Sequence, residues 1–262
     1  MAIVADQNAA QSIFEKNLSL YHRSGVPVDY LLAEDLKHRP GDYRLYVFLN
    51  LFTYDEETRL AVEKLRARGA TLLWLYAPGY LKDNTLDAMK ALTGIEFAAM
   101  EKPGLAGVTM KEDGRFMGSP NEEVARRFYP VKPDVTLGVY EDGRPGVAAV
   151  KLGKSVSIFS GAWQLDQKFI SKIVDKAGAH VFSESGDPVE ANDAFVMLHA
   201  RFPGEKTIRL PRKATVVDVF ERKLVGRDID VIAFDAALHS THFFYFGDDA
   251  DELLAKLKRD FK

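Results

Sequence analysis

The chain has 262 residues, of which 47% are hydrophobic and 28% are charged, a composition typical of ordinary soluble globular proteins. Its net charge of −3 gives no general reason to expect a nucleic acid or an anionic membrane as a partner. The absence of cysteine excludes disulfides, thiolate catalysis and cysteine-ligated metals. Because the first ten residues lack a basic segment, and because no apolar run approaches ~18 residues, we expect a cytoplasmic protein without a signal peptide or a membrane span.

Strands and helices alternate along the first hundred residues. Apolar runs predict β-strands at 2–6, 28–33, 44–52 and 71–77. The run at 44–52 has no polar alternation until Asn50, as expected for a parallel strand that is buried on both faces. This alternation predicts a mostly parallel sheet with helices on both faces.

Helix signals fill the gaps between these strands. One helical stretch runs to about Ser24 and is closed by Gly25. The next lies between Thr53 and Gly69, where Thr53 and Glu56 have the spacing of a capping box. A short third helix ends at Gly94.

The pattern changes after residue 96. Short strands joined by Asp-Gly and Pro-Gly turns are predicted within 107–116 and 136–161. An amphipathic helix at 164–178 follows, and 180–185 is a candidate for a further edge strand. From residue 194 five strand-like segments precede an amphipathic helix at 248–262.

We therefore predict an α/β protein with two domains. Residues 1–186 form the α/β domain, and residues 187–262 form a small antiparallel, sandwich-like β-domain with a C-terminal helix.

Three segments resemble bacterial β-galactosidases of the glycoside hydrolase type. Residues 43–84 and 145–163 resemble the trimerisation domain of these enzymes, and residues 189–220 are similar to the small β-domain that follows it. The resemblance implies a class I glutamine-amidotransferase-like, flavodoxin-like fold. It also implies a role in assembly, with a homo-oligomer or a hydrolase barrel domain as partner. In such an assembly the domain would form a wall of a neighbouring subunit's sugar site.

The chain offers no match to the catalytic barrel of those hydrolases, which needs eight strand–helix units over roughly 200 residues. It is therefore either a portion of a larger enzyme or a free-standing relative. In active amidotransferase-like enzymes a cysteine stands at the elbow between strand and helix, and here that turn reads Tyr76-Ala77-Pro78-Gly79-Tyr80. Without cysteine, amidotransferase chemistry is excluded.

Other catalytic motifs are also missing. The segment 157–163 lacks the first glycine of a G-x-S-x-G elbow, and the Gly-Lys-Ser at 153–155 is better interpreted as a hairpin turn than as a phosphate loop. We predict no catalytic residue in this chain.

Metal and cofactor sites are not expected either. The acids Glu184, Asp187, Glu190 and Asp193 are interpreted as a solvated loop between domains. His239 and His242 would point to opposite faces of a strand. His199 is expected to be a hydrogen-bonded strand residue.

Four residues are candidates for a cleft at the carboxyl ends of the parallel strands: Asp6, Asn50, Tyr76 and Tyr80. In the alternative interpretation Asp6 and Asn50 cap helices or close turns, and the tyrosines pack at a subunit contact.

Two further functions stay open. The first is an independent hydrolase with a non-standard site at Asp6, Asn50 and Tyr76. The second is a carbohydrate-binding protein that uses aromatic residues of the strand 242–246, where Phe243 and Tyr245 share one face and Phe244 and Phe246 share the other.

Overall fold

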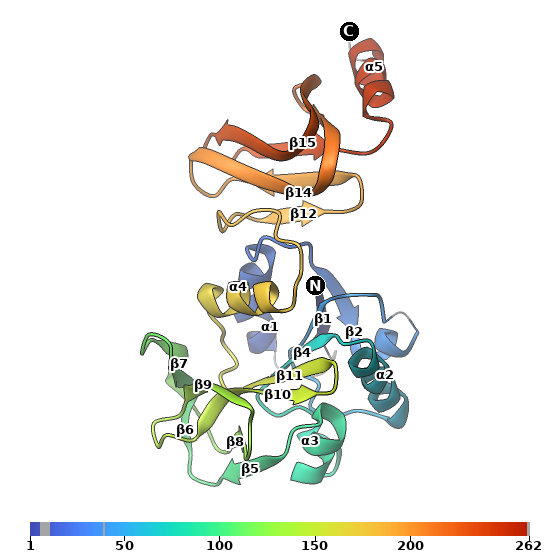
Figure 1. Ribbon diagram of the computed structural model, residues 1–262. Helices are drawn as coiled ribbons and strands as arrows, with labels where there is room; N and C mark the ends of the chain where they lie inside the picture. The colour runs from blue at the N-terminus through green and yellow to red at the C-terminus, as the bar shows by residue number, and fades with distance from the viewer. Residues whose placement is uncertain (6–10, 39, 261–262) are drawn as a thin grey trace. The chain divides into compact units, whose positions relative to one another are not determined.

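The computed structural model describes residues 1–5, 11–38 and 40–260 (Figure 1). The chain forms two compact units. One comprises Met1–Leu18 and Asp29–Phe169, and the other comprises Ser19–Val28 and Ile170–Lys262. Helices α1 (Gln11–His22) and α4 (Gln167–Lys176) each contribute residues to both units. The predicted division into domains 1–186 and 187–262 stays a prediction.

The first unit is built on a nine-stranded sheet with the order β2-β1-β3-β4-β11-β10-β9-β6-β7. Its first five strands pair in parallel, and the other four continue the sheet in antiparallel pairings. A separate antiparallel pair, β5-β8, lies in the same unit. The bounds of these strands are β1 (Ala2–Ala5), β2 (Asp29–Leu32), β3 (Leu45–Phe48), β4 (Thr71–Leu75), β5 (Phe97–Met100), β6 (Gly104–Met110), β7 (Phe116–Val124), β8 (Arg127–Pro130), β9 (Val135–Val139), β10 (Pro145–Leu152) and β11 (Ser155–Ser160).

The predicted strands β1 to β4 and the helices between them are present, but β3 and β4 end at Phe48 and Leu75, before the predicted ends at 52 and 77. Two 3-10 helices, η1 (Ala33–Lys37) and η2 (Tyr80–Lys82), follow β2 and the elbow after β4. Helix α2 covers Glu56–Ala67, and α3 covers Leu86–Thr93 and ends at Gly94 in the left-handed conformation.

The predicted capping box at Thr53 and Glu56 is wrong. Helix α2 begins at Glu56, so its N-cap is Asp55, whose carboxylate accepts a hydrogen bond of 2.7 Å from the backbone N–H of Thr58. A helix starts where a side chain accepts hydrogen bonds from its first free N–H groups. Here that side chain is Asp55, which directly precedes the helix, and not Thr53.

Both faces of the strands β3 and β4 are buried, as their apolar runs predict, whereas the edge strand β2 is largely exposed. Tyr46, Phe48, Leu72 and Trp74 belong to a core cluster with apolar residues of α2 and α3, and the rings of Phe48 and Trp74 stack with centroids 4.0 Å apart. On the other face Val47 is fully buried as well. The core thereby fixes the positions at which β3 and β4 end.

The predicted hairpin turn at 153–155 is confirmed. Leu152 of β10 pairs with Ser155 of β11, and Gly153 has a φ of 63°, which glycine adopts without strain. The Gly-Lys-Ser sequence therefore closes a tight hairpin.

The second unit contains a five-stranded antiparallel sheet with the order β12-β13-β16-β14-β15. Phe244 and Phe246 lie in its core, whereas Phe243 and Tyr245 are half-buried on the other face, as strand alternation predicts. The predicted terminal helix is confirmed as α5. The bounds are β12 (Val189–Ala191), β13 (Phe195–His199), β14 (Gly204–Asp218), β15 (Lys223–Ala236), β16 (Thr241–Tyr245) and α5 (Ala250–Asp260).

The predicted edge strand at 180–185 is wrong, because this segment forms no strand. Phe182 donates one backbone hydrogen bond to Gly25 and accepts one from Arg209, both 2.7 Å long. These two hydrogen bonds go to different segments, so residues 180–185 do not pair with a neighbouring strand. The apolar pattern here reflects burial of Phe182 in the core of the second unit.

Candidate functional site

The elbow after β4 is a strained turn at Tyr76. Tyr76 has a φ of 61°, in the left-handed region that a bulky side chain rarely adopts. Its backbone N–H donates to Ser160 at 2.8 Å, and the N–H of Gly79 donates to Leu51 at 2.8 Å. The backbone is therefore held in this bend by the ends of the neighbouring strands.

Aromatic rings surround the elbow. The Tyr76 ring makes edge contacts with Phe52, Phe128 and Trp163, at centroid distances of 6.1, 6.0 and 5.3 Å. The Tyr80 ring lies 4.8 Å from Phe128. Phe128 is buried, while the other four rings are partly exposed. We call these five residues the elbow cluster.

The hydroxyl groups of the elbow cluster are already engaged. Tyr76 donates its O–H to the backbone carbonyl of Arg126 at 3.0 Å. The Arg126 guanidinium donates to the Tyr80 hydroxyl and pairs with Glu101 at 2.7 Å. Burial raises the pKa of the Tyr76 hydroxyl, and the opposing effect of Arg126 is smaller. A neutral phenol that donates its proton to a carbonyl is not an activated nucleophile.

The four predicted cleft residues have different positions. Tyr76 and Tyr80 lie together in the elbow cluster. Asn50 follows β3 and is only 3% exposed. Its segment runs beside the elbow, because Gly79 bonds to Leu51 and the N–H of Leu81 donates to Phe52 at 2.7 Å. Asp6 lies outside the described residues.

Sequence reasoning missed Arg126, Phe128 and Trp163, which complete this site from segments far along the chain. Trp163 lies three residues after the end of the closing strand β11, and a ring so close to a strand end could have been predicted as part of the site. Its segment is fixed by Asn17 of α1, which donates to the Trp163 carbonyl at 2.7 Å. No local pattern marks Arg126 or Phe128.

A cavity of about 300 Å³ opens beside the elbow, at the carboxyl ends of β2 and β3. These strands flank β1 on its two sides, and open α/β sheets bind ligands at such points. The cavity is lined by two carboxylates, those of Glu34 and Asp55. They differ in environment, because the Asp55 carboxylate is engaged as the N-cap of α2. The lining residues are Ala33, Glu34, Leu51, Thr53, Tyr54, Asp55 and Thr58.

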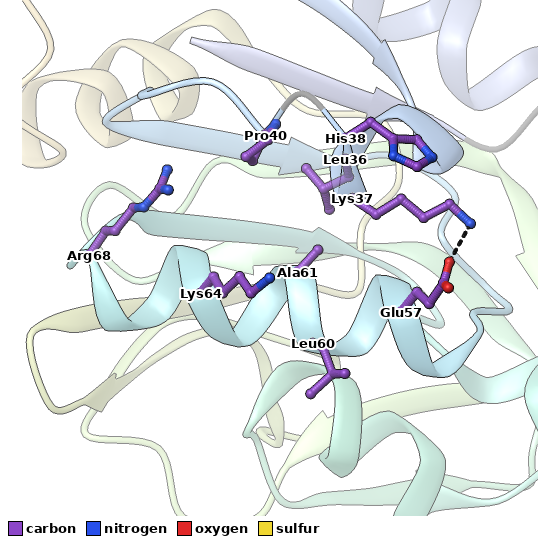
Figure 2. Close-up of a pocket in the computed structure, with 9 residues that line it drawn as sticks. All are labelled: Leu36, Lys37, His38, Pro40, Glu57, Leu60, Ala61, Lys64 and Arg68. Carbon is purple, nitrogen blue, oxygen red and sulfur yellow. Dashed lines mark hydrogen bonds and ion pairs between the residues drawn. The ribbon is translucent and has the colours of Figure 1, made fainter.

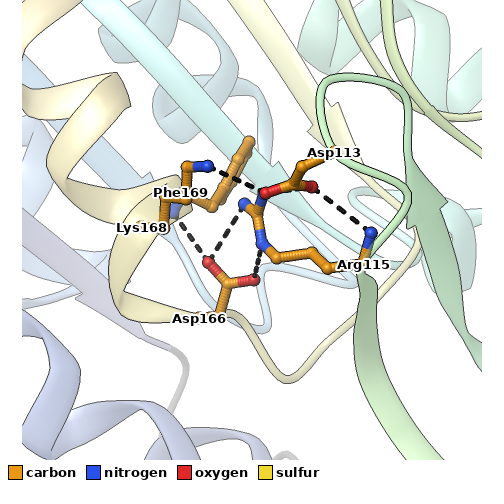
Figure 3. Close-up of polar contacts among 5 residues, drawn as sticks. All are labelled: Asp113, Arg115, Asp166, Lys168 and Phe169. Carbon is orange, nitrogen blue, oxygen red and sulfur yellow. Dashed lines mark hydrogen bonds and ion pairs between the residues drawn. The ribbon is translucent and has the colours of Figure 1, made fainter.

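A second polar cluster lies near the start of α4 (Figure 3). Asp166 accepts from the backbone N–H of Phe169 and from Arg115, each at 2.7 Å, and Asp113 pairs with Arg115 at 2.7 Å and with Lys168 at 2.8 Å. The Lys168 ammonium is the main cause of a lowered pKa at Asp113. Two cations and two carboxylates balance, so this cluster holds the start of α4 to the β6–β7 turn.

Two histidines of the second unit have hydrogen-bond partners in place of metal ligation. His199 pairs with Thr241 and His242 pairs with Ser240, each at 2.9 Å. The prediction for His199 is confirmed. Among the described residues no group of three or more His, Asp or Glu side chains could hold a metal ion.

The acidic loop is not uniformly solvated, which corrects the interpretation of Asp187. Asp187 is 1% exposed and pairs with Lys206 at 2.8 Å. Glu190 lies 2.9 Å from His22. A buried carboxylate loses its hydration, so composition alone favours a solvated acid at this position. The charge of the buried Lys206 ammonium offsets that desolvation cost for Asp187.

Within the described ranges, no helix combines the length and the apolar character needed to cross a bilayer.

No protein-family description matches the chain, and no curated protein matches it. Solved structures do. A β-galactosidase from Bacillus circulans sp. alkalophilus aligns over 94% of this chain and 41% of its own length, at 13% identity and a TM-score of 0.61. A catalytic mutant of a GH42 β-galactosidase from G. stearothermophilus aligns over 93% and 40%, at 17% identity and 0.61. A β-galactosidase from the haloarchaeon Halorubrum lacusprofundi aligns over 95% and 40%, at 14% identity and 0.56.

The predicted resemblance to β-galactosidase-type hydrolases is thus confirmed at the level of the fold. The chain spans about two fifths of the length of these structures. A fold likeness does not carry an activity with it, because function depends on the site.

Proposed function

We propose that this chain is a non-catalytic assembly region of a β-galactosidase-like glycoside hydrolase. It would hold copies of the enzyme, or the chain and a barrel domain, in a fixed arrangement, and could wall part of a neighbouring subunit's sugar site. The single observation that carries the proposal is the elbow after β4, where the neutral hydroxyl of Tyr76 is bonded to a carbonyl in place of an activated nucleophile.

The proposal includes the finer fold assignment. The parallel strands follow the order β2-β1-β3-β4-β11, which supports a flavodoxin-like, amidotransferase-like core. In that core the residue after β4 is the elbow residue. A tyrosine in place of the nucleophilic cysteine supports the interpretation that this domain has the amidotransferase-like turn but lacks the amidotransferase nucleophile.

The elbow cluster also supports a contact surface. Four of its five rings are only partly covered, and the adjoining Leu81 is 57% exposed. Partly exposed aromatic residues with a large aliphatic neighbour are typical of protein interfaces. We therefore place the subunit contact at Tyr76, Tyr80 and Leu81.

Sedimentation velocity of the purified chain and of Leu81→Asp tests the proposal. We expect the parent chain to associate and Leu81→Asp to shift the equilibrium toward the monomer, because a carboxylate would be buried in the contact. Leu238→Asp is the control, since Leu238 is 55% exposed and lies in the other unit. A parent chain that stays monomeric at high concentration, with and without a candidate barrel domain, would refute the assembly role.

An activity assay separates assembly from independent hydrolysis. The chain should not hydrolyse nitrophenyl β-galactosides or esters by itself. Turnover that disappears in Tyr76→Phe or Asn50→Ala would instead favour a hydrolase with a non-standard site.

One observation favours carbohydrate binding as a second candidate. On the half-buried face of the second unit, the rings of Phe195 and Phe243 stack 5.0 Å apart, and Phe195 lies 4.7 Å from Tyr245. Stacked rings of this kind can accept the apolar face of a pyranose. Calorimetry with galactosides, repeated on Phe243→Ala, tests this candidate; absence of heat with the parent chain would exclude it for those sugars.

A further inference from the structure

A second cavity, of about 370 Å³, lies between α2 and four residues that follow β2, namely Leu36, Lys37, His38 and Pro40 (Figure 2). Its volume is within the roughly 300–1,000 Å³ of small-molecule sites. The lining residues are Leu36, Lys37, His38, Pro40, Glu57, Leu60, Ala61, Lys64 and Arg68.

One part of this cavity is apolar. Leu36 and Ala61 form its base, with exposures of 0% and 5%, and both belong to the core of the first unit. Leu60 remains 43% exposed on α2. A ligand that covered Leu60 would remove apolar surface from water, whereas Leu36 and Ala61 are already buried and only shape the base of the cavity.

The other part is cationic. Lys64 lies in the last turn of α2 and Arg68 is the C-cap residue of that helix, so their spacing of four residues starts both side chains from the same side of the helix. Arg68 donates one hydrogen bond of 3.1 Å to the Gly41 carbonyl, which steadies the guanidinium and leaves other N–H groups for a ligand. In the described part of the chain Lys64 has no ion-pair partner.

The remaining charges of the cavity nearly balance each other. Lys37 pairs with Glu57 at 2.7 Å, and the hydrogen bond from that carboxylate raises the pKa of Lys37. The cavity therefore has an excess of positive charge, from Lys64 and Arg68, in a chain whose net charge is −3. A local cationic site of this kind attracts anions.

We propose that this cavity binds a small organic anion, whose carboxylate or phosphate group lies between Lys64 and Arg68 and whose ring or alkyl body covers the exposed side chain of Leu60. A guanidinium beside an ammonium recognises oxyanions through charge-assisted hydrogen bonds. A neutral sugar would leave both cations without a counter-ion, and a cationic ligand would be repelled. This site is independent of the assembly role.

The test uses the full chain and the probe 8-anilinonaphthalene-1-sulfonate, which joins an anionic group to an apolar body. Its fluorescence titration is repeated with inorganic phosphate as a competitor. We expect saturable binding that phosphate weakens, and binding about ten-fold weaker in Lys64→Gln/Arg68→Gln, since each charge-assisted contact at an exposed site contributes modestly. Lys90→Gln is the matched control, because Lys90 is an exposed lysine on α3.

Leu60→Ser separates the two parts of the site. It should weaken binding of the probe and leave unchanged the phosphate affinity measured by equilibrium dialysis. The proposal is overturned if the double variant binds the probe as tightly as the parent chain, or if Lys90→Gln loses as much affinity. Circular dichroism of each variant ensures that only folded proteins are compared. If the double variant does not fold, the single variant Lys64→Gln takes its place in the titration.

Discussion

The backbone strain at Tyr76 can be measured by comparing Tyr76→Gly with Tyr76→Ala. Both variants lose the same ring and hydroxyl, so their difference isolates the backbone. A left-handed conformation costs a non-glycine residue about 1–2 kcal/mol, and the extra freedom of glycine in the unfolded chain offsets about 0.5–1 kcal/mol of the relief. We expect Tyr76→Gly to be more stable than Tyr76→Ala by about 0.5–1 kcal/mol, the reverse of the usual order.

Both variants should be less stable than the parent chain by about 2–3 kcal/mol, because three ring contacts and one partly buried hydrogen bond disappear. Tyr76→Phe isolates the hydrogen bond and should cost about 1 kcal/mol.

Urea unfolding followed by tryptophan fluorescence is the appropriate assay. The chain has two tryptophans, Trp74 and Trp163, and both belong to the first unit, so the signal reports the unit that contains Tyr76. Glu63→Ala and Glu63→Gly, at an exposed position within α2, are the control and should show alanine more stable by about 1 kcal/mol. An alanine variant at position 76 that is as stable as the glycine variant would refute the strain.

Three further changes test other parts of the fold. Asp55→Ala removes the N-cap of α2 and should cost about 1 kcal/mol in urea unfolding at neutral pH. The backbone N–H bond lowers the pKa of Asp55, so its contribution is present above the unfolded pKa and is lost as the pH falls through the folded value; equal costs at neutral and strongly acidic pH would contradict this. Lys206→Met leaves the buried carboxylate of Asp187 without its cation and should cost about 3–5 kcal/mol in thermal unfolding, part of which the double variant with Asp187→Asn recovers. Gly25→Ala should destabilise more than Gly178→Ala, because both glycines have positive φ but only at Gly25 would the new methyl group strike a backbone carbonyl; equal melting temperatures would argue against that clash.

Much of the fold could be predicted because its signals are local. An apolar run such as residues 45–49 predicts burial on both faces of a strand, and a glycine such as Gly94 favours the end of a helix through its left-handed conformation. The errors occurred where a local pattern was compatible with two outcomes. Residues 180–185 have strand composition, but Phe182 is buried without a partner strand.

The candidate site depended on contacts between distant segments. Sequence spacing placed Tyr76 and Tyr80 at the end of β4, but their partners Phe128 and Trp163 lie about 50 and 90 residues away along the chain. Hydrophobic periodicity indicates which residues are buried, not which residues meet.

The sequence by itself determined the alternation of strands and helices, the parallel strands of the first unit and the absence of a thiol at the elbow, since these follow from residue type and short-range spacing. Only the tertiary structure decided the left-handed backbone of Tyr76, the burial of Asp187 beside Lys206 and the two cations over an apolar base at Lys64 and Arg68. These features depend on how distant segments pack, and packing is determined by the free energy of the whole chain, which no short stretch of sequence contains.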